Sequence, residues 1–285
     1  MATGATEFID RTTADVFIPE VWSGLAIVAR ENKLIFGNLV DRRFESELKV
    51  GDVVHVPSVG NLATRTKSIN TAITYETVTE TNLDITVTTH EYAAIAVESI
   101  AELQTNRAQL ELYAGKMGYA LALSFDDVLA GLVDNFTQVV GTLAVELTLE
   151  DILRAIQYLD DADVPSEERV FVMSPAQSIA MLKYDSFIHK DYESMHGPVG
   201  GAMEAGYVTS FLGIPILKSV NVEGTNSAGH DNGLFHKSAL AAIMQMTPSA
   251  HSMYDIDYLA DKVAIEHVHG SAEMRDDHGV WMKGL

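Results

Sequence analysis

The sequence predicts an α+β fold in which an extended β-hairpin, one long helix and a strand–helix region follow one another along the chain. Three observations predict it. Residues 51–57 and 83–88 have the patterns of two strands, separated by a long polar segment. Residues 98–133 carry apolar side chains at helical spacing. Residues 148–217 alternate between helix and strand signals, which suggests an α/β subdomain within the α+β fold.

The composition indicates one elaborated domain or two interlocked ones, with a strong negative charge. The chain has 285 residues, and 47% of them are hydrophobic, which is ample for a packed core. Its 19 basic and 40 acidic residues give a formal net charge of −21. This charge argues against direct nucleic-acid binding and against an anionic membrane surface, because phosphates are bound by clustered Lys and Arg. Copies that self-associate must overcome mutual repulsion through apolar contacts and strand pairing.

Several kinds of site and segment are excluded by the sequence. It contains no cysteine, which rules out disulfides, thiolate nucleophiles and thiolate metal sites. The first eleven residues have no apolar core flanked by positive charge, so we expect no signal peptide. A run of about 18 apolar residues, which a membrane helix needs, is also missing. We therefore expect synthesis in the cytoplasm and no membrane partner.

The N-terminal part of the chain is predicted to be an arm followed by a short helix. Residues 1–17 are polar and rich in threonine, as flexible termini are. A helix is expected from Pro19, because proline suits the first helical position, and its apolar side chains include Trp22. We expect the arm to contact other chains.

The hairpin is predicted from turn signals and from alternation. Gly51 and Asp52 mark a turn, and the strand that follows ends at Pro57. From Leu83 to Thr88 apolar and polar residues alternate strictly, which is typical of a half-buried strand. The segment between the two strands has few apolar residues to pack. Such long loops are usually functional, and we expect this one to reach another chain.

Residues 98–133 are predicted to form one amphipathic helix of about 35 residues, roughly 50 Å long at 1.5 Å per residue. Proline is absent from this stretch, although its glycines weaken the helix by up to about 1 kcal/mol each. Because average helices have about 11–12 residues, one of this length suggests the spine of a thin protein. The apolar positions are Ile100, Leu103, Leu110, Tyr113, Met117, Leu121, Val128 and Leu132.

The second half of the chain predicts a strand–helix subdomain and returning strands. Thr148 is expected to cap a helix that runs to about Asp160. Residues 169–173 predict a buried strand, and Ser174-Pro175 predicts the start of a helix. Two stretches rich in Gly and Asn are predicted to be loops, at 191–206 and 223–233. A short strand is predicted at 213–217, and several strands are predicted within 239–281.

Six local motifs accompany this order: FIPEVW (17–22), GDVVHVP (51–57), SPA (174–176), LGIPILKS (212–219), HKSAL (236–240) and VHGSAEMR (268–275). In order and spacing they resemble the HK97-type capsid proteins of tailed bacteriophages over nearly the whole chain. The resemblance implies a major capsid protein without catalytic activity or cofactor. The division that it implies is N-terminal arm 1–18, first helix and lead-in 19–50, extended hairpin (E-loop) 51–92, P-domain spine helix 93–147, A-domain 148–240, and strands returning through the P- and A-domains 241–285.

The resemblance also implies partners. Copies of the chain would form hexamers and pentamers of an icosahedral virion shell, made in the host bacterial cytoplasm, with double-stranded phage DNA only as non-specific contents. Because the expected first helix begins at Pro19, scaffolding would come from a separate protein. A portal protein is expected as well, and a decoration protein is compatible with the same shell.

The candidate contact residues lie mainly in the hairpin tip. Arg65 and Lys67 are the only Lys, Arg, Asp or Glu residues between Asp52 and Glu76, so the tip is locally positive in an acidic protein. The alternatives are two solvated charges or a tip that docks on a neighbour's acidic surface. On the spine helix, Arg107 falls on the apolar side, where it either extends to solvent or bridges subunits. The full set of expected interface residues is Arg65, Lys67, Ile69, Ile73, Arg107 and Trp22.

Two histidines raise the question of a metal. His267 and His269 are two apart, so on a strand they share a face and could bind metal with His278 or Asp277. An ordinary strand is the favoured interpretation, and neither a metal site nor a catalytic site is expected. Two alternatives to a phage shell remain open: an encapsulin-like cargo compartment, which genome neighbours would reveal, and a metal-dependent enzyme, which stoichiometric bound metal would support.

Overall fold

The computed structural model describes residues 34–46, 48–59, 62–78, 80–98, 108–181, 183–184 and 207–285. These residues all belong to one compact unit. The expected arm, the helix from Pro19 with Trp22, and Arg107 lie outside the described residues. In the described ranges, no helix combines the length and the apolar character that crossing a membrane requires.

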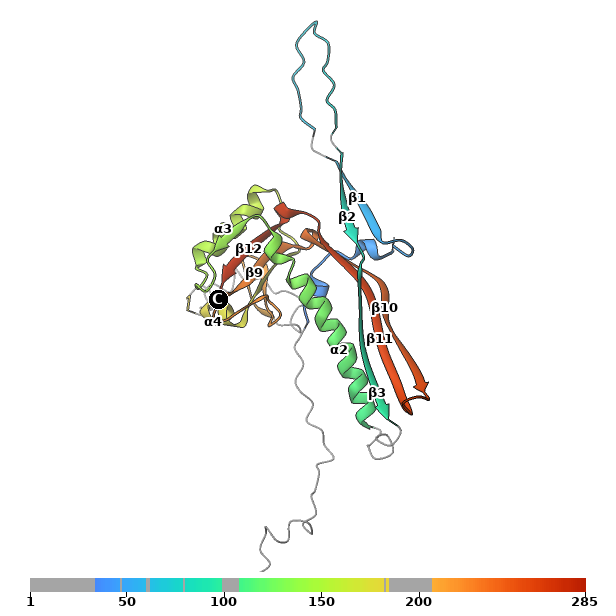
Figure 1. The fold of residues 1–285 in the computed structure, drawn as a ribbon. Coiled ribbons are helices and arrows are strands. Elements are labelled where there is room, and N and C mark those ends of the chain that lie inside the picture. The colour runs from blue at the N-terminus through green and yellow to red at the C-terminus, as the bar shows by residue number, and fades with distance from the viewer. Residues whose placement is uncertain are drawn as a thin grey trace, which may run out of the picture. The chain divides into compact units, whose positions relative to one another are not determined.

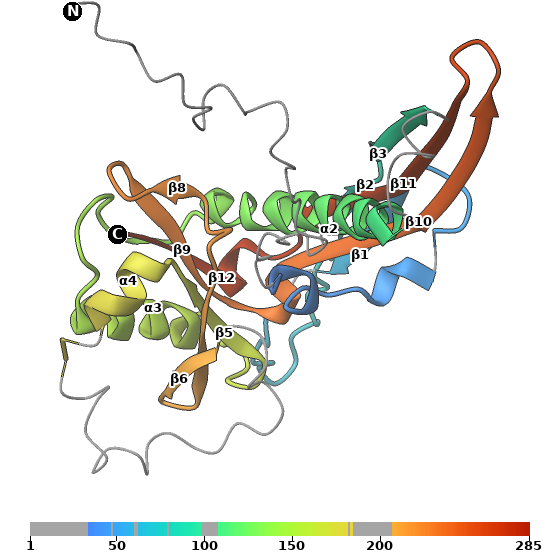
Figure 2. The ribbon, with the colours of Figure 1, turned by 90° about the horizontal axis from the view of Figure 1, so that it is seen from below.

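The strands form three sheets (Figures 1 and 2). The first pairs β1 (Val53–Val59) with β2 (Glu80–Thr86), and the second has the order β10 (Leu240–Asp255), β11 (Ala260–Glu273), β3 (Thr89–Glu98). The third is a 7-stranded sheet with the order β4 (Val139–Gly141), β12 (Gly279–Gly284), β9 (Gly229–His236), β5 (Arg169–Met173), β7 (Ile214–Lys218) and β6 (Tyr207–Phe211), with β8 (Gly224–Thr225) paired to β9. It mixes parallel and antiparallel pairs, as expected for an α+β fold.

Three α-helices are described: α2 (Ala108–Ala130), α3 (Leu149–Asp161) and α4 (Pro175–Met181). Thr148 caps α3 as predicted, because its side chain accepts a hydrogen bond from the backbone N–H of Asp151 and the Asp151 carboxylate accepts one from Thr148 N. Ser174 caps α4 in the same way, through the N–H of Gln177. Short 3₁₀ turns join the other elements: η2 (Phe36–Asn38), η3 (Arg43–Ser46), η4 (Val133–Asn135), η6 (Lys237–Ala239) and η7 (Asp276–His278).

The spine helix differs from the prediction at its ends and on its packed face. Glu98, which was expected at the start of the helix, is the last residue of β3. Residues 99–107 lie outside the described residues, and α2 ends at Ala130. Val128, expected to pack, is 38% exposed. Met117 and Leu121 are buried as predicted, and the buried face continues at a spacing of four through Phe125 and Leu129.

The predicted loop at 223–233 is wrong at Gly224–Thr225, which form the short strand β8, and again in its second half. Residues from Gly229 onward form β9, which lies inside the 7-stranded sheet. Small and polar residues here serve close packing: a Cβ at Gly233 would collide with Val133, and the buried Asn232 amide accepts a hydrogen bond from Ser174 N. Glycine and asparagine are typical of loops, so this part of the strand gives no strand signal.

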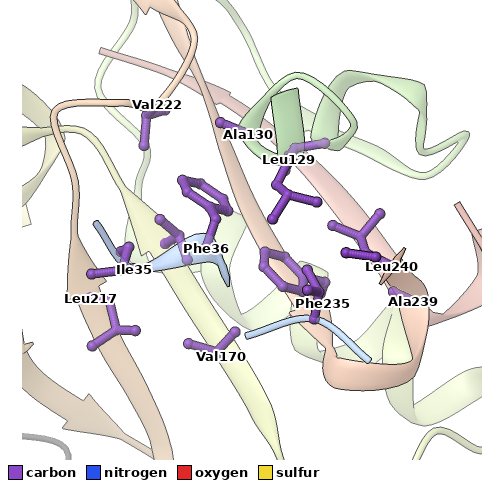
Figure 3. Close-up of a cluster of buried hydrophobic side chains, with 14 of the residues drawn as sticks. Ile35, Phe36, Leu129, Ala130, Val170, Leu217, Val222, Phe235, Ala239 and Leu240 are labelled. Atoms are coloured by element: carbon purple, nitrogen blue, oxygen red, sulfur yellow. The ribbon is translucent and has the colours of Figure 1, made fainter. Parts of the chain in front are cut away.

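Two apolar clusters cover the two faces of the 7-stranded sheet. Alternation along β5 sends Val170 and Val172 to one cluster and Phe171 and Met173 to the other. The first cluster, shown in part in Figure 3, joins the sheet to the end of α2 and to η2. The second lies under α3 and α4. Because β5 is buried on both faces, its sequence is continuously apolar after Arg169, as predicted for a central strand.

Candidate assembly surfaces

The base of the β1–β2 hairpin is fixed to the three-stranded sheet. The strands pair in register from Val53 opposite Thr86 to Val59 opposite Glu80. At the base, Ile85 is fully buried in a cluster that includes Ile243 of β10. On β11, Gly270 leaves room for the passing chain, since a Cβ there would collide with the carbonyl oxygen of Thr86. The hairpin is therefore anchored at one end by apolar contacts.

The hairpin tip, residues 62–78, lacks such contacts. Every one of these residues is exposed, and none belongs to a helix or strand (Figure 1). Ile69 is 93% and Tyr75 84% exposed. Local order comes from a turn in which Thr71 N donates to Ser68 O at 3.4 Å and from Ala63 N, which donates to a Glu76 oxygen at 3.2 Å. The tip thus presents apolar side chains without a core to receive them.

The predicted site residues of the tip are all exposed. Arg65 and Lys67 lie within the tip, and neither makes an ion pair within the described part of the chain. Ile73 is more than half exposed, and Leu62 and Val78 are exposed as well. With Glu76 as the third charge, the tip carries one net positive charge, against −21 for the chain. The structure brings four of the six predicted residues onto one segment, and the other two lie outside the described residues.

A second exposed apolar surface was not predicted from the sequence. It surrounds the turn between β10 and β11, where the strands run beyond the core. Exposed large side chains gather there: Met253, Tyr254, Ile256, Tyr258 and Leu259. Hairpin turns are usually polar, so five large apolar side chains within residues 253–259, interrupted only by Asp255 and Asp257, were the signal in the sequence.

His267 and His269 meet a carboxylate other than those considered from the sequence. Both imidazoles are buried on one face of β11, and His267 pairs across the strands with Glu91 of β3. The Nε2 atoms of His267 and His269 lie 3.1 and 3.5 Å from Glu91 Oε2. Burial would raise the pKa of Glu91, but hydrogen bonds from Ser124 and His267 outweigh it and the pKa is lowered. Burial, reinforced by the adjacent His267, lowers the pKa of His269.

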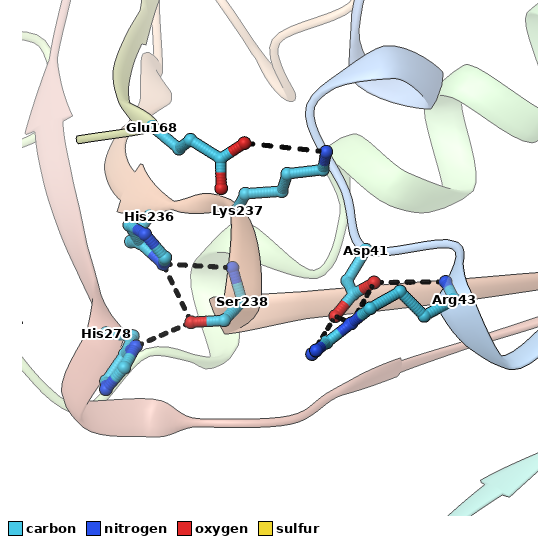
Figure 4. A network of polar contacts seen from close by, with 7 residues as sticks. All are labelled: Asp41, Arg43, Glu168, His236, Lys237, Ser238 and His278. Atoms are coloured by element: carbon cyan, nitrogen blue, oxygen red, sulfur yellow. Dashed lines mark hydrogen bonds and ion pairs between the residues drawn. The ribbon is translucent and has the colours of Figure 1, made fainter. Parts of the chain in front are cut away.

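His278 belongs instead to a polar network where β9 leads into β10 (Figure 4). The Ser238 hydroxyl lies 2.7 Å from Nδ1 of His236 and 2.7 Å from Nδ1 of His278. Since the backbone N–H of Ser238 donates to His236 Nδ1, that nitrogen is unprotonated and also accepts the hydroxyl proton. The N–H of His278 Nδ1 then donates to the Ser238 oxygen. This arrangement requires the imidazole of His236 to be neutral, because its Nδ1 atom accepts.

The network predicts that the unfolding free energy falls with acidification. Burial, with Arg169 and Arg275 nearby, lowers the pKa of His236 in spite of Glu168. Burial and Arg275 likewise lower the pKa of His278 in spite of Asp277. Unfolded imidazoles take up protons near pH 6.5 and the folded ones only at lower pH, so the unfolded state binds more protons in between. The unfolding free energy should decrease from pH 7 downward, by at most about 1.4 kcal/mol per pH unit for each histidine.

Urea unfolding of the unassembled subunit between pH 5 and 8 measures this effect. The double variant His236→Asn, His278→Asn keeps a hydrogen-bonding atom near each Nδ1 position without a titrating ring, and it should show a shallower pH dependence. His55 is exposed and lies outside this network, where it pairs with Asp84, so His55→Asn is the control for the loss of a histidine elsewhere. An unchanged slope in the double variant would refute this assignment.

Comparison with known proteins identifies the family. The family model described as phage capsid protein matches residues 47–275, from just before the hairpin to the end of β11 and beyond. The chain belongs to the phage capsid protein family. This is a family of structural shell proteins, and it favours a phage shell over a cargo compartment or a metal-dependent enzyme. None of the curated proteins matches the sequence.

Similarity to solved structures identifies the fold of this capsid protein. A structure from Mycobacterium phage Che8 is 23% identical with a TM-score of 0.77, covering 93% of this chain and 97% of that chain. The capsid structure of the cyanophage P-SCSP1u is 19% identical with a TM-score of 0.74 over 96% and 94% of the two chains. The capsid of Ralstonia phage GP4 is 12% identical with a TM-score of 0.68 over 100% and 98%. The HK97-type fold is thereby confirmed, and the chain is a major capsid protein that assembles into a multimeric shell.

Proposed function

We propose that hexamers and pentamers of this capsid protein form an icosahedral shell around double-stranded phage DNA, and that the hairpin tip docks on a neighbouring copy. The observation that carries the proposal is the complete exposure of residues 62–78, which combine apolar and cationic side chains. The chain itself has no catalytic role in this scheme.

The apolar part of the tip supplies the attraction. Burial of a large aliphatic side chain contributes about 1.5–3 kcal/mol relative to leaving it exposed, and Ile69 and Ile73 both have most of that gain still available. A pair of open strands is also prone to uncontrolled pairing with other chains. Docking on a neighbour would bury the apolar side chains and cover the open strands. The anchored base of the hairpin limits where the tip can reach.

The positive charge of the tip favours docking on an acidic surface. Copies with a charge of −21 repel one another, whereas Arg65 and Lys67 give the tip a net positive charge that an acidic surface attracts. One exposed ion pair contributes only about 0–1 kcal/mol. A shell repeats the contact in every subunit, so small contributions add across the lattice.

Further contacts belong to the same proposal. The apolar turn between β10 and β11 is suited to meet another copy, and β3 and β10 are the edge strands of their sheet. Trp22 and Arg107, which lie outside the described residues, remain proposed interface residues. The division proposed for the chain is N-terminal arm 1–18, first helix and lead-in 19–50, extended hairpin 51–92, P-domain 93–147 with the spine helix α2 and also β4, A-domain 148–240 and returning strands 241–285.

The proposed partners follow from the acidic composition and the shell role. A separate scaffolding protein would bring the repelling copies together, a portal protein would occupy one vertex, and a decoration protein would bind outside. DNA would be enclosed without sequence-specific contacts, because the chain has 40 acidic residues against 19 basic ones. Synthesis would take place in the host cytoplasm and the virion would be the final location.

Reversal of the tip charges tests the electrostatic part of the proposal. We expect Arg65→Glu with Lys67→Glu to leave the circular dichroism and melting of the unassembled subunit unchanged, because both side chains are exposed. Shell yield should fall by about tenfold or more, since two attractions become two repulsions, together worth roughly 1.5 kcal/mol per contact. Light scattering and sedimentation measure the yield.

The matched control makes the same charge change elsewhere. Lys49→Glu with Lys218→Glu alters two exposed cations outside the tip and the net charge equally. If both double variants lose shells to the same degree, general repulsion explains the loss. If the tip variant forms shells of normal yield and heat resistance, the tip does not dock through its charges.

A further inference from the structure

The three-stranded sheet contains a buried group of potential metal ligands that the shell function does not use. Glu91, His267 and His269 place one carboxylate oxygen and two imidazole nitrogens within 4.8 Å of one another. The two histidines are two residues apart on β11 and therefore share a face. Glu91 joins them because β3 pairs with β11 in a register that sets Glu91 opposite His267.

The distances suit a tetrahedral ion. Zinc binds imidazole nitrogen at about 2.0–2.1 Å and carboxylate oxygen at about 2.0–2.2 Å, so neighbouring ligand atoms of a tetrahedron are about 3.3–3.5 Å apart. The contacts from Glu91 Oε2 to the Nε2 atoms of His267 and His269 are 3.1 and 3.5 Å. All three ligand atoms lie within 4.8 Å of one another, so the rings must move to bring every pair to the spacing of a tetrahedral ion.

His269 provides an independent indication of a ligand. Its side chain is fully buried, and neither ring nitrogen makes a hydrogen bond among the described residues, since Nε2 has only the 3.5 Å contact with Glu91 Oε2. Its neighbours are the rings of Phe125 and His267, both edge-on, with centroids 5.0 and 4.9 Å away. A buried polar group without a partner costs about 1–3 kcal/mol, and such groups are rare enough in folded proteins to require an explanation.

The carboxylate is oriented from the helix above it. Ser124 of α2 donates a hydrogen bond of 2.7 Å to Glu91 Oε1, which leaves Oε2 directed at the imidazoles. Outer partners of this kind commonly fix the ligands of metal sites. A cavity of about 220 Å³ reaches His267 between α2 and β10, with Phe125 and Met244 in its lining, and offers a path for an ion and a water ligand.

We propose that Glu91, His267 and His269 bind one divalent transition-metal ion of the zinc class, with water as fourth ligand. Two imidazoles and one carboxylate favour Zn²⁺ over Mg²⁺ or Ca²⁺, which prefer oxygen ligands alone. The ion ties β3 to β11, and Ser124 connects it to α2. It stabilises each subunit, whether or not that subunit is part of a shell.

Zinc binding by the full-length chain tests the proposal. After treatment with chelator and desalting, the protein is incubated with ZnCl2, desalted again and analysed for metal. We expect about one zinc per chain and a melting temperature raised by several degrees, because a ligand that binds only the folded state stabilises it. MgCl2 should have neither effect.

Two variants and one control decide the assignment. His269→Phe removes a ligand but fills the space beside Phe125, so the subunit should stay folded and lose both zinc and the zinc-dependent shift. Glu91→Gln keeps a hydrogen-bonding side chain and should bind zinc at least tenfold more weakly. His251→Ala removes an exposed imidazole of β10 that contacts Glu266, and it should behave as the parent chain.

Three results would overturn the proposal. The parent chain retains no zinc and shows no shift, the His269→Phe variant responds to zinc like the parent chain, or the response disappears in His251→Ala instead. If His269→Phe does not fold, the comparison of Glu91→Gln with the parent chain decides in its place.

Discussion

Replacement of residues 62–78 by a Gly-Asn-Gly turn is expected to give a folded subunit that no longer builds shells. The removed residues are all exposed, so no core contact is lost. The shorter loop lowers the entropy cost of closing the hairpin by roughly 1.5 kcal/mol, so the subunit should melt at the same temperature or slightly higher. Assembly should be abolished, because the replacement removes both the apolar and the cationic side chains of the tip.

Melting by circular dichroism and shell counting by electron microscopy measure the two halves of this prediction. A scrambled tip of equal length and composition, with Ile69, Ile73, Arg65 and Lys67 moved to other positions in it, is the control for loop length. Shells of normal yield from the shortened chain would show that the tip is dispensable. A subunit that unfolds would show that the tip supports its own domain.

The opposite outcome is expected for Phe235→Ala. Phe235 is fully buried in β9, within the cluster that joins the 7-stranded sheet to the end of α2 (Figure 3). Its ring packs against Phe136 with centroids 6.4 Å apart. Truncation of a buried phenylalanine costs about 3–5 kcal/mol, a large part of the roughly 5–15 kcal/mol that stabilise a typical domain.

Urea unfolding of the subunit measures the loss of unfolding free energy in Phe235→Ala. Shell yield should fall only as far as the folded population falls, and it should recover at lower temperature. Tyr92→Ala, which truncates an exposed ring of β3, is the control and should cost less than about 0.5 kcal/mol of subunit stability. If Phe235→Ala lowers the unfolding free energy by less than about 1 kcal/mol, the cluster does not join the 7-stranded sheet to the end of α2 as described.

Local patterns predicted the hairpin and the caps of this fold. Strict alternation through Leu83, Ile85 and Val87 was enough for β2, because one face of that strand is buried and the other is solvated. Thr148 and Ser174 were found because capping depends on residues within one turn of the helix. The exposed, positive tip followed from composition alone.

Features that depend on distant contacts were missed. β3 alternates in burial, but alanines occupy both its faces, so the sequence shows no contrast. The association of Glu91 with His267 depends on a strand register between residues 176 positions apart. The glycine-rich start of β9 is a strand because of what packs around it, which its own residues do not reveal.

Cryo-electron microscopy of shells assembled from the purified chain and a scaffolding protein tests the central claim most directly. The account predicts an icosahedral shell in which residues 62–78 contact a neighbouring copy, with Ile69 and Ile73 buried at that contact and Arg65 and Lys67 beside its acidic side chains. Shells in which the tip points into solvent or folds back on its own subunit would contradict the account.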